Sequence, residues 1–263
     1  MAVDASASPN TTDPGRVAPS RRHGGRGPAA WVAMYHSVSA CPDDPYDITV
    51  TPERFGRQLD WLRRRGLRGV SVAELLDARA RGEERGLIGL TFDDGYSDFV
   101  TAALPVLRRY DCNATVFLLS GRLGGENDWE HTGPVKRLLD AASIRQLADE
   151  GVEIASHGLT HADLASLPDP ELGEEVQRSR DVLAQITGVP VQGFCYPYGK
   201  VDERVKAAVE RAGYRYACAI APDPGFVGDL ALPRIHIGQH DSALRLELKR
   251  RLARVWGRAV SPA

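Results

Sequence analysis

Short apolar runs alternate with amphipathic stretches along most of this chain. The first run, over residues 29–35, predicts a buried strand. A helix is expected next, because Thr51 offers an N-cap, Pro52 suits the first helical turn, and apolar residues then recur at helical spacing as far as Gly66. The hydrophobic pattern therefore opens with one strand followed by one helix.

The same alternation continues to the end of the chain. Further strands are expected around Val70 and over residues 87–91, 114–119, 152–155, 191–195, 214–219 and 232–237. Further helices are expected over residues 72–80, 97–110, 170–187, 202–212 and 242–256, with others between a glycine-rich loop at 121–133 and residue 150. Repeated strand–helix units predict a parallel sheet covered by helices, and without a repeat of solenoid period a closed α/β barrel is favoured over an open doubly wound sheet.

The length of 263 residues suits one barrel domain with a single large core. Residues 1–28 are rich in Ala, Ser, Thr, Pro, Gly and Arg and almost lack large apolar side chains. Such a segment cannot bury enough surface to offset the entropy of ordering it. We therefore expect a disordered tail over residues 1–28 and one domain over residues 29–263.

Charge and cysteine content limit the classes of partner. The formal net charge of −2 provides no global field that would gather nucleic acid. No apolar run approaches the ~20 residues of a membrane helix, and no signal-peptide core is seen near the start, so a cytoplasmic protein is expected. The four cysteines show no C-x-x-C pair, which predicts reduced thiols; they are Cys41, Cys112, Cys195 and Cys218.

Two adjacent carboxylates, Asp93 and Asp94, follow the predicted strand at 87–91. Parallel α/β barrels place catalytic residues at this end of their strands. Consecutive side chains point in different directions, so one carboxylate can bind a cation while the other acts as a base, and Gly95 permits a tight turn behind them. The alternative is a surface turn that caps a helix.

Two histidines, His157 and His161, follow the strand at 152–155 and are four residues apart. One helical turn would place both imidazoles on one face, as a zinc site requires. Together with one carboxylate they would make three protein ligands and leave a position for water, as in catalytic zinc sites, although cobalt or nickel would also suit these ligands. The alternative is a pair of surface histidines.

A third polar segment, Tyr196–Pro197–Tyr198–Gly199, follows the strand at 191–195. Proline has no N–H, so the amide of Tyr198 is the candidate donor to an anion in the cleft. The alternative is an ordinary turn that packs on aromatic residues.

These three motifs, T-F-D-D-G, S-H-x-x-x-H and Y-P-Y-G, resemble in kind and order those of the polysaccharide deacetylase family, also called NodB homology or carbohydrate esterase family 4. The resemblance covers residues 30–240. It implies a distorted (β/α) barrel with about seven parallel strands and a zinc-like divalent ion. It also implies a hydrolase acting on non-peptide carbon–nitrogen bonds, which removes acetyl groups from N-acetylated saccharides.

The resemblance also implies roles for individual residues. Asp93 would be the general base, and the N–H of Tyr198 would face the oxyanion. The metal ligands would be Asp94, His157 and His161. The early Y-H-S-V segment at residues 35–38 is similar to that of poly-N-acetylglucosamine deacetylases, which implies His36 as the general acid.

The chain departs from the family pattern in three places, one of which is the family's later Trp-Asp motif, for which it has no clear match. Many members carry an arginine near position 195 that pairs with the base, but Cys195 and Tyr196 stand there, and Arg234 could supply that charge or form an ordinary salt bridge instead. The late Leu-x-His motif is not clear, which leaves His236 and His240 as alternatives to His36.

Other interpretations stay open on sequence alone. The same fold could hydrolyse O-acetyl esters or non-sugar amides, or bind carbohydrate without turnover. Trp129 could stack on a sugar ring or cap the barrel. The helix at 242–256 mixes leucines with basic residues; it could serve a membrane surface, but we expect its apolar face to pack on the barrel. The oligomeric state is not predicted.

Overall fold

The computed structural model describes residues 31–220, 222 and 228–259, so the tail expected over residues 1–28 lies outside the described residues. Eight strands form the main sheet, and every neighbouring pair in it is parallel. The strands are β1 (Val32–Tyr35), β4 (Arg68–Val70), β5 (Leu87–Phe92), β6 (Thr115–Leu118), β7 (Glu153–Ser156), β8 (Gly193–Cys195), β9 (Tyr216–Ile220) and β10 (Leu232–His236).

The sheet closes because β1 pairs with two strands. It lies between β10, where Val32 is opposite Arg234, and β5, where Val32 is opposite Gly89. Strands β1, β10, β9, β8, β7, β6 and β5 therefore form a ring of seven, and β4 pairs only with the first residues of β5. The predicted distorted (β/α) barrel is confirmed.

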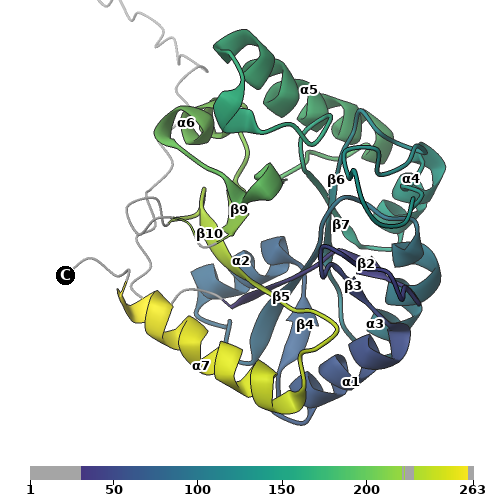
Figure 1. Ribbon diagram of the computed structural model, residues 1–263. Coiled ribbons are helices and arrows are strands. Elements are labelled where there is room, and N and C mark those ends of the chain that lie inside the picture. The colour runs from purple at the N-terminus through teal and green to yellow at the C-terminus, as the bar shows by residue number, and fades with distance from the viewer. Residues whose placement is uncertain (1–30, 221, 223–227, 260–263) are drawn as a thin grey trace, which may run out of the picture.

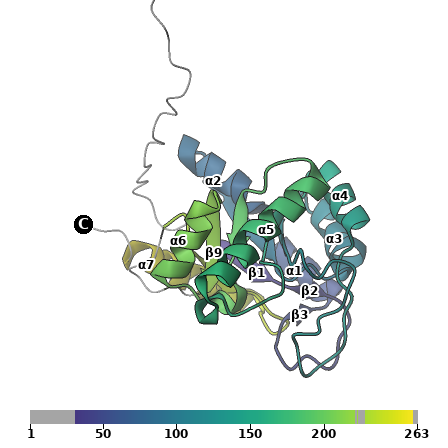
Figure 2. The same cartoon turned by 90° about the horizontal axis from the view of Figure 1, so that it is seen from above.

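Most helices lie around the ring of strands (Figures 1 and 2). The helices are α1 (Pro52–Arg63), α2 (Val72–Arg81), α3 (Leu104–Arg109), α4 (Ala141–Asp149), α5 (Asp169–Thr187), α6 (Glu203–Arg211) and α7 (Ala243–Ala259). Helix α2 is the exception to this arrangement, since it lies behind the strands in the view of Figure 1. Short helical turns are η1 (Phe99–Ala103), η2 (Leu164–Ser166) and η3 (Pro197–Gly199). The N-cap expected for the first helix is present, since Thr51 Oγ1 accepts a hydrogen bond from Arg54 N at 3.2 Å.

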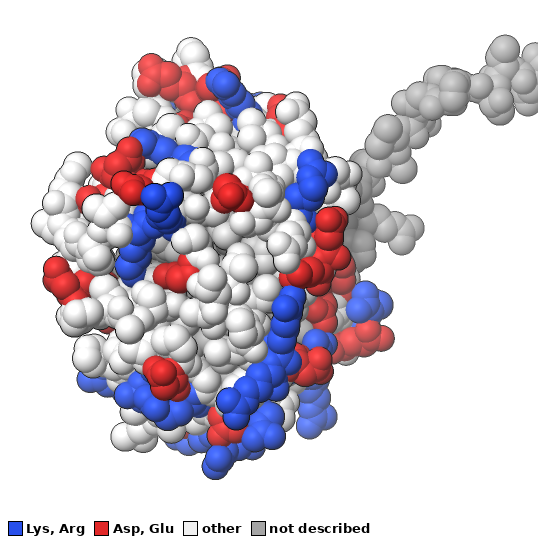
Figure 3. Space-filling view, turned by 90° about the vertical axis from the view of Figure 1, so that its right-hand side faces the viewer, with Lys and Arg blue, Asp and Glu red and all other residues white. Residues whose placement is uncertain are grey.

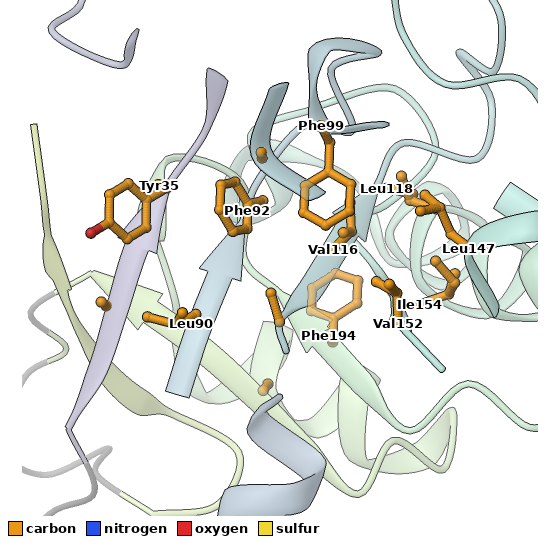
Figure 4. Close-up of a cluster of buried hydrophobic side chains, with 14 of the residues drawn as sticks. Tyr35, Leu90, Phe92, Phe99, Val116, Leu118, Leu147, Val152, Ile154 and Phe194 are labelled. Atoms are coloured by element: carbon orange, nitrogen blue, oxygen red, sulfur yellow. The ribbon is translucent and has the colours of Figure 1, made fainter. Parts of the chain in front are cut away.

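Alternating residues of the strands belong to two apolar cores. Val116 and Ile154 pack with the surrounding helices (Figure 4), whereas their neighbours Phe117 and Ala155 belong to a second cluster. That second cluster also contains Leu75 of α2. Both faces of the strands are therefore buried, which explains why they read as apolar runs rather than alternating patterns.

The structure adds elements that the hydrophobic pattern does not reveal. Strands β2 (Ser37–Val38) and β3 (Thr49–Val50) form a small parallel pair directly after His36. The helix expected over residues 97–110 begins with the π-helical turn η1, and α3 follows it with Pro105 in its first turn. The glycine-rich loop expected over residues 121–133 is present and continues as far as α4, the one helix formed between that loop and residue 150.

Helix α7 does not pack as its sequence predicts. Leu246 is buried, but Leu244, Leu248 and Leu252 are 80%, 57% and 50% exposed. The expectation that the apolar face of this helix packs on the barrel is therefore wrong for these three leucines. The side of the helix that carries Leu246 packs on the barrel instead.

On the face of the molecule that Figure 3 shows, acidic and basic side chains of the described residues are interspersed, and neither sign of charge forms a broad patch. None of the described helices combines the length and the apolar composition that crossing a membrane requires.

Candidate active site

The two adjacent carboxylates lie directly after β5, at the edge of the barrel where parallel strands end. The chain turns sharply there, because Asp94 and Gly95 adopt φ values of 67° and 74°. A Cβ at position 95 would lie 2.5 Å from Leu118 Cδ2, so only glycine fits. This turn points Asp93 and Asp94 toward different partners, as their adjacency predicts.

Asp93 pairs with Arg234, which reaches it from β10. Arg234 Nη1 donates to Asp93 Oδ1 at 2.6 Å and Nη2 donates to Oδ2 at 2.7 Å, which is a bidentate geometry. Nη1 also donates to Thr91 Oγ1 at 3.1 Å, and Nη2 lies 2.9 Å from Cys195 Sγ. The sequence left two alternatives for Arg234, a partner for Asp93 or an ordinary salt bridge elsewhere. In the structure Arg234 lies beside Asp93.

The pair keeps Asp93 charged inside the protein. Burial alone would raise the pKa of Asp93, but the Arg234 guanidinium outweighs burial and lowers the pKa below its usual value. Burial raises the pKa of the neighbouring Cys195 thiol well above its usual value, so that group stays protonated. Asp93 is therefore an ionised carboxylate with a neutral thiol beside it.

Asp94, His157 and His161 converge on one point. Asp94 Oδ1 lies 3.4 Å from His157 Nε2 and 3.5 Å from His161 Nε2. These are about the spacings between ligands that lie ~2 Å from one tetrahedral zinc ion. Asp94 Oδ1 is buried and accepts no hydrogen bond from the described residues. A cation would satisfy that oxygen, so the three residues fit a divalent metal.

The ring orientation of His157 suits the same role. Its Nδ1 lies 2.8 Å from the carbonyl oxygen of Cys195, and an N–H there would leave Nε2 free to bind a metal. Burial lowers the pKa of His161 to about 4, which keeps that imidazole neutral as a ligand must be.

A second group of potential ligands overlaps the first. Asp93, His157 and Cys195 also bring their ligand atoms within 4.8 Å of one another. Asp93 is already engaged by Arg234, however, and the Cys195 thiol resists deprotonation. The Asp94 group is therefore the better cation site.

The segment from His157 to His161 is a loop, and the helical turn expected there is not formed. Gly158 and His161 both have positive φ values, 87° and 67°. Glu175 on α5 holds the loop: its carboxylate accepts hydrogen bonds from Leu159 N at 2.7 Å, from Thr160 N at 3.2 Å and from Thr160 Oγ1 at 2.5 Å. Side chain to backbone contacts, rather than helical periodicity, bring the two imidazoles together.

Replacing Glu175 by Ala should loosen this loop. The change leaves the partly buried N–H groups of Leu159 and Thr160 without their acceptor, which is expected to lower the free energy of unfolding by roughly 1 kcal/mol or more. Urea unfolding of the variant measures this loss, with Glu174→Ala as the control because Glu174 lies beside it on the exposed side of α5. Equal stability of the two variants would contradict the role assigned to Glu175.

Aromatic rings enclose the outer side of His161. Trp129 stacks on its ring at 5.1 Å between centroids, and Tyr198 meets it edge-on at 4.5 Å. Tyr198 itself has a φ of 58°, which is unusual for a bulky residue. Three of the five described non-glycine residues with positive φ are thus Asp94, His161 and Tyr198, and strained backbone of this kind is typical of functional sites.

One cavity of about 180 Å³ unites these groups. All seven site residues predicted from sequence line it: His36, Asp93, Asp94, His157, His161, Tyr198 and Arg234. Its wall also includes four residues that sequence reasoning missed, namely Tyr46, Ile48, Glu130 and Ile220. They come from loops and a strand end without a motif of their own, so no sequence signal marks them.

The structure distinguishes the three candidate acid histidines by position. His36 lines the cavity, and its Nε2 lies 3.9 Å from Asp93 Oδ2. Neither His236 nor His240 is among the lining residues, and His240 is exposed. Only His36 of the three therefore stands beside the other site groups.

Comparison with known proteins gives a consistent result. The family model for polysaccharide deacetylase matches residues 80–217. The chain is 26% identical to the YxkH protein of Bacillus subtilis over 212 residues, which are 78% of this chain and 70% of that protein. It is 23% identical to the poly-beta-1,6-N-acetyl-D-glucosamine N-deacetylase of Staphylococcus epidermidis, covering 72% of this chain and 68% of the relative.

Solved structures share the fold. The deacetylase PplD of Streptococcus pyogenes, in complex with acetate, aligns with a TM-score of 0.71 at 23% identity, covering 85% of this chain and 99% of that one. IcaB from Ammonifex degensii aligns with a TM-score of 0.69 at 23% identity, covering 88% and 97%. At these sequence identities the structural similarity shows that the barrel fold is shared.

Proposed function

Since this chain belongs to the polysaccharide deacetylase family, we propose that it is a metal-dependent hydrolase that removes acetyl groups from N-acetylated sugars. The observation that carries the proposal is that one cavity brings a candidate metal-binding triad together with the ionised Asp93 and with His36. A metal site, a base and an acid are the groups that a metal-dependent amide hydrolase uses. The N-acetyl substrate is supported by the Staphylococcus epidermidis relative, whose name states that activity.

Asp94, His157 and His161 would hold the divalent metal, with zinc as the expected ion and cobalt or nickel as alternatives. When bound, the metal would supply Lewis acidity toward water and the acyl oxygen. The chain itself holds the two imidazoles in place through Glu175 and the Cys195 carbonyl, and Trp129 shields one side of His161.

Asp93 acts as the general base in this proposal. Its carboxylate takes a proton from the attacking water, and Arg234 keeps it ionised and fixed in orientation through two hydrogen bonds. Attack on the acyl carbon generates a tetrahedral oxyanion, toward which the backbone N–H of Tyr198 would donate. The unusual φ of Tyr198 supports this role, because a strained turn at a cavity wall is retained when its orientation is used.

His36 acts as the general acid. Its Nε2 lies 3.9 Å from Asp93 Oδ2, and its side chain is 14% exposed. The imidazole therefore lies at the cavity and can exchange protons with solvent. In its protonated form it donates to the departing amine, because an amide nitrogen leaves readily only after it gains a proton. Base and acid are separate groups, since one must begin deprotonated and the other protonated.

The His36→Gln variant tests this assignment through the leaving group. We expect kcat for an N-acetylated sugar to fall by about 10²–10⁴-fold, because protonation of the amine is lost. Hydrolysis of 4-nitrophenyl acetate should fall far less, since nitrophenolate leaves without a proton. His240→Gln is the control and should match the wild type on both substrates. Equal losses of His36→Gln on both substrates would exclude His36 as the acid.

A substrate panel tests the proposed activity. Acetate release is measured from N-acetylglucosamine oligomers, from acetylated xylan and from simple acetamides, at equal enzyme concentration. The proposal predicts that the N-acetylglucosamine oligomers are hydrolysed with the highest kcat/KM. Preference for acetylated xylan would make the protein an O-acetyl esterase, and sugar binding without any acetate release would make it a carbohydrate-binding protein.

A further inference from the structure

Helix α7 carries a stripe of exposed leucines that the proposed activity does not use. Eight large apolar side chains are exposed in the described part of the chain, and three of them, Tyr46, Tyr198 and Ile220, line the active-site cavity. Three others are the leucines at positions 244, 248 and 252, which recur every four residues and therefore lie along one side of the helix. We call them the leucine stripe.

The leucine stripe is not needed to attach α7 to the barrel. Attachment comes from the opposite side, where Leu246 is buried in the main core. Lys249 adds polar contacts, since its Nζ donates to the carbonyl oxygen of His236 at 2.7 Å and to Asp241 Oδ2 at 2.5 Å. The helix thus has two apolar sides, and the side with more leucines faces away from the barrel.

Basic residues accompany the stripe. Glu247 is the one acidic residue within α7, against six basic residues: Arg245, Lys249, Arg250, Arg251, Arg254 and Arg258. Glu247 is shared by Arg65, Arg250 and Arg251 through hydrogen bonds of 2.6–3.2 Å, which leaves positive charge in excess along the helix. Arg245 and Arg251 are exposed and stand next to the leucines in sequence.

We propose that the leucine stripe of α7 docks on an anionic lipid surface, with the helix lying in the plane of the interface. Exposed leucines flanked by arginines are the composition that such helices use: the leucines enter the acyl boundary and the guanidinium groups meet lipid phosphates. The charge selects this occupant over a second copy of the chain, because pairing two α7 helices would bring like charges together, whereas anionic lipids attract each of them.

Vesicle flotation of the full-length chain tests the proposal. Vesicles of phosphatidylcholine with added phosphatidylglycerol should carry the protein, vesicles of phosphatidylcholine alone should carry much less, and high salt should release it. The triple variant Leu244→Gln, Leu248→Gln, Leu252→Gln should lower the partition coefficient at least about tenfold. The double variant Val135→Gln, Val189→Gln removes exposed apolar side chains elsewhere, 72% and 57% exposed, and should float like the wild type.

The same variants show whether the leucine stripe binds something other than lipid. Circular dichroism should show that the triple variant stays folded, because its changes are at exposed positions. Flotation of the triple variant equal to that of the wild type would overturn the proposal. A wild-type chain that does not bind anionic vesicles would also overturn it. Sedimentation velocity would then show whether the wild type forms a dimer that the triple variant abolishes, in which case the stripe is an interface between two copies of the chain. Neither outcome depends on the deacetylase activity.

Discussion

Replacing Asp93 by Asn is expected to lower kcat for acetate release by about 10²–10⁴-fold, the usual contribution of a general base. The amide is nearly isosteric with the carboxylate but cannot accept a proton from water. The three proposed metal ligands are untouched, so metal content should remain that of the wild type. Steady-state kinetics and metal analysis on the same preparation provide both readouts.

The matched variant is Asp94→Asn, at the adjacent position on the same turn. It should lower metal affinity as well as activity, because Asp94 Oδ1 is the point where the two imidazoles converge. The two asparagine variants therefore separate the base from the ligand. If Asp93→Asn lost the metal and Asp94→Asn kept it, the two roles would be exchanged, and full activity of Asp93→Asn would remove the base from the mechanism.

Replacing Arg234 by Leu is expected to cost about 3–5 kcal/mol in the free energy of unfolding, because it leaves the buried Asp93 carboxylate without its cation. Arg234 and Asp93 are both almost fully buried, and two hydrogen bonds join them. Arg215→Leu is the control, since its pair with Asp77 lies on the surface and should contribute less than about 1 kcal/mol. Urea unfolding compares the two variants.

The loss of stability caused by Arg234→Leu should become smaller as the pH falls. The pKa of Asp93 is lowered in the folded protein, so the stabilisation from this pair is present above the pKa of an unfolded aspartate and is lost as the pH falls toward the lower folded value. The stability difference between wild type and variant should therefore shrink in acid. Without Arg234, burial raises the pKa of Asp93, which should move the acid limb of the activity profile to higher pH. A pH-independent stability difference would contradict this account.

The barrel could be predicted from sequence because its strands are short and apolar and most of them are followed by a helix. Asp93 and Asp94 could be placed for the same reason, since a residue directly after a parallel strand lies at the edge where all such strands end. The resemblance then supplied roles that the pattern alone left open, including that of His36.

Contacts between distant segments could not be predicted in this way. Arg234 and Asp93 are 141 residues apart, and two positions for Arg234 were equally compatible with the pattern. The spacing of His157 and His161 suggested a helical turn, but their loop conformation depends on Glu175, on a helix that comes later in the chain. The exposure of the α7 leucines likewise depends on which side of that helix the barrel accepts.

The most direct test of the central claim is acetate release from N-acetylglucosamine oligomers by the same wild-type preparation before chelation, after chelation and after zinc is added back. The account predicts about one divalent ion per chain before chelation, because one triad converges on one point. Activity should be lost with the ion and restored by zinc. Undiminished acetate release from metal-free protein would contradict the account.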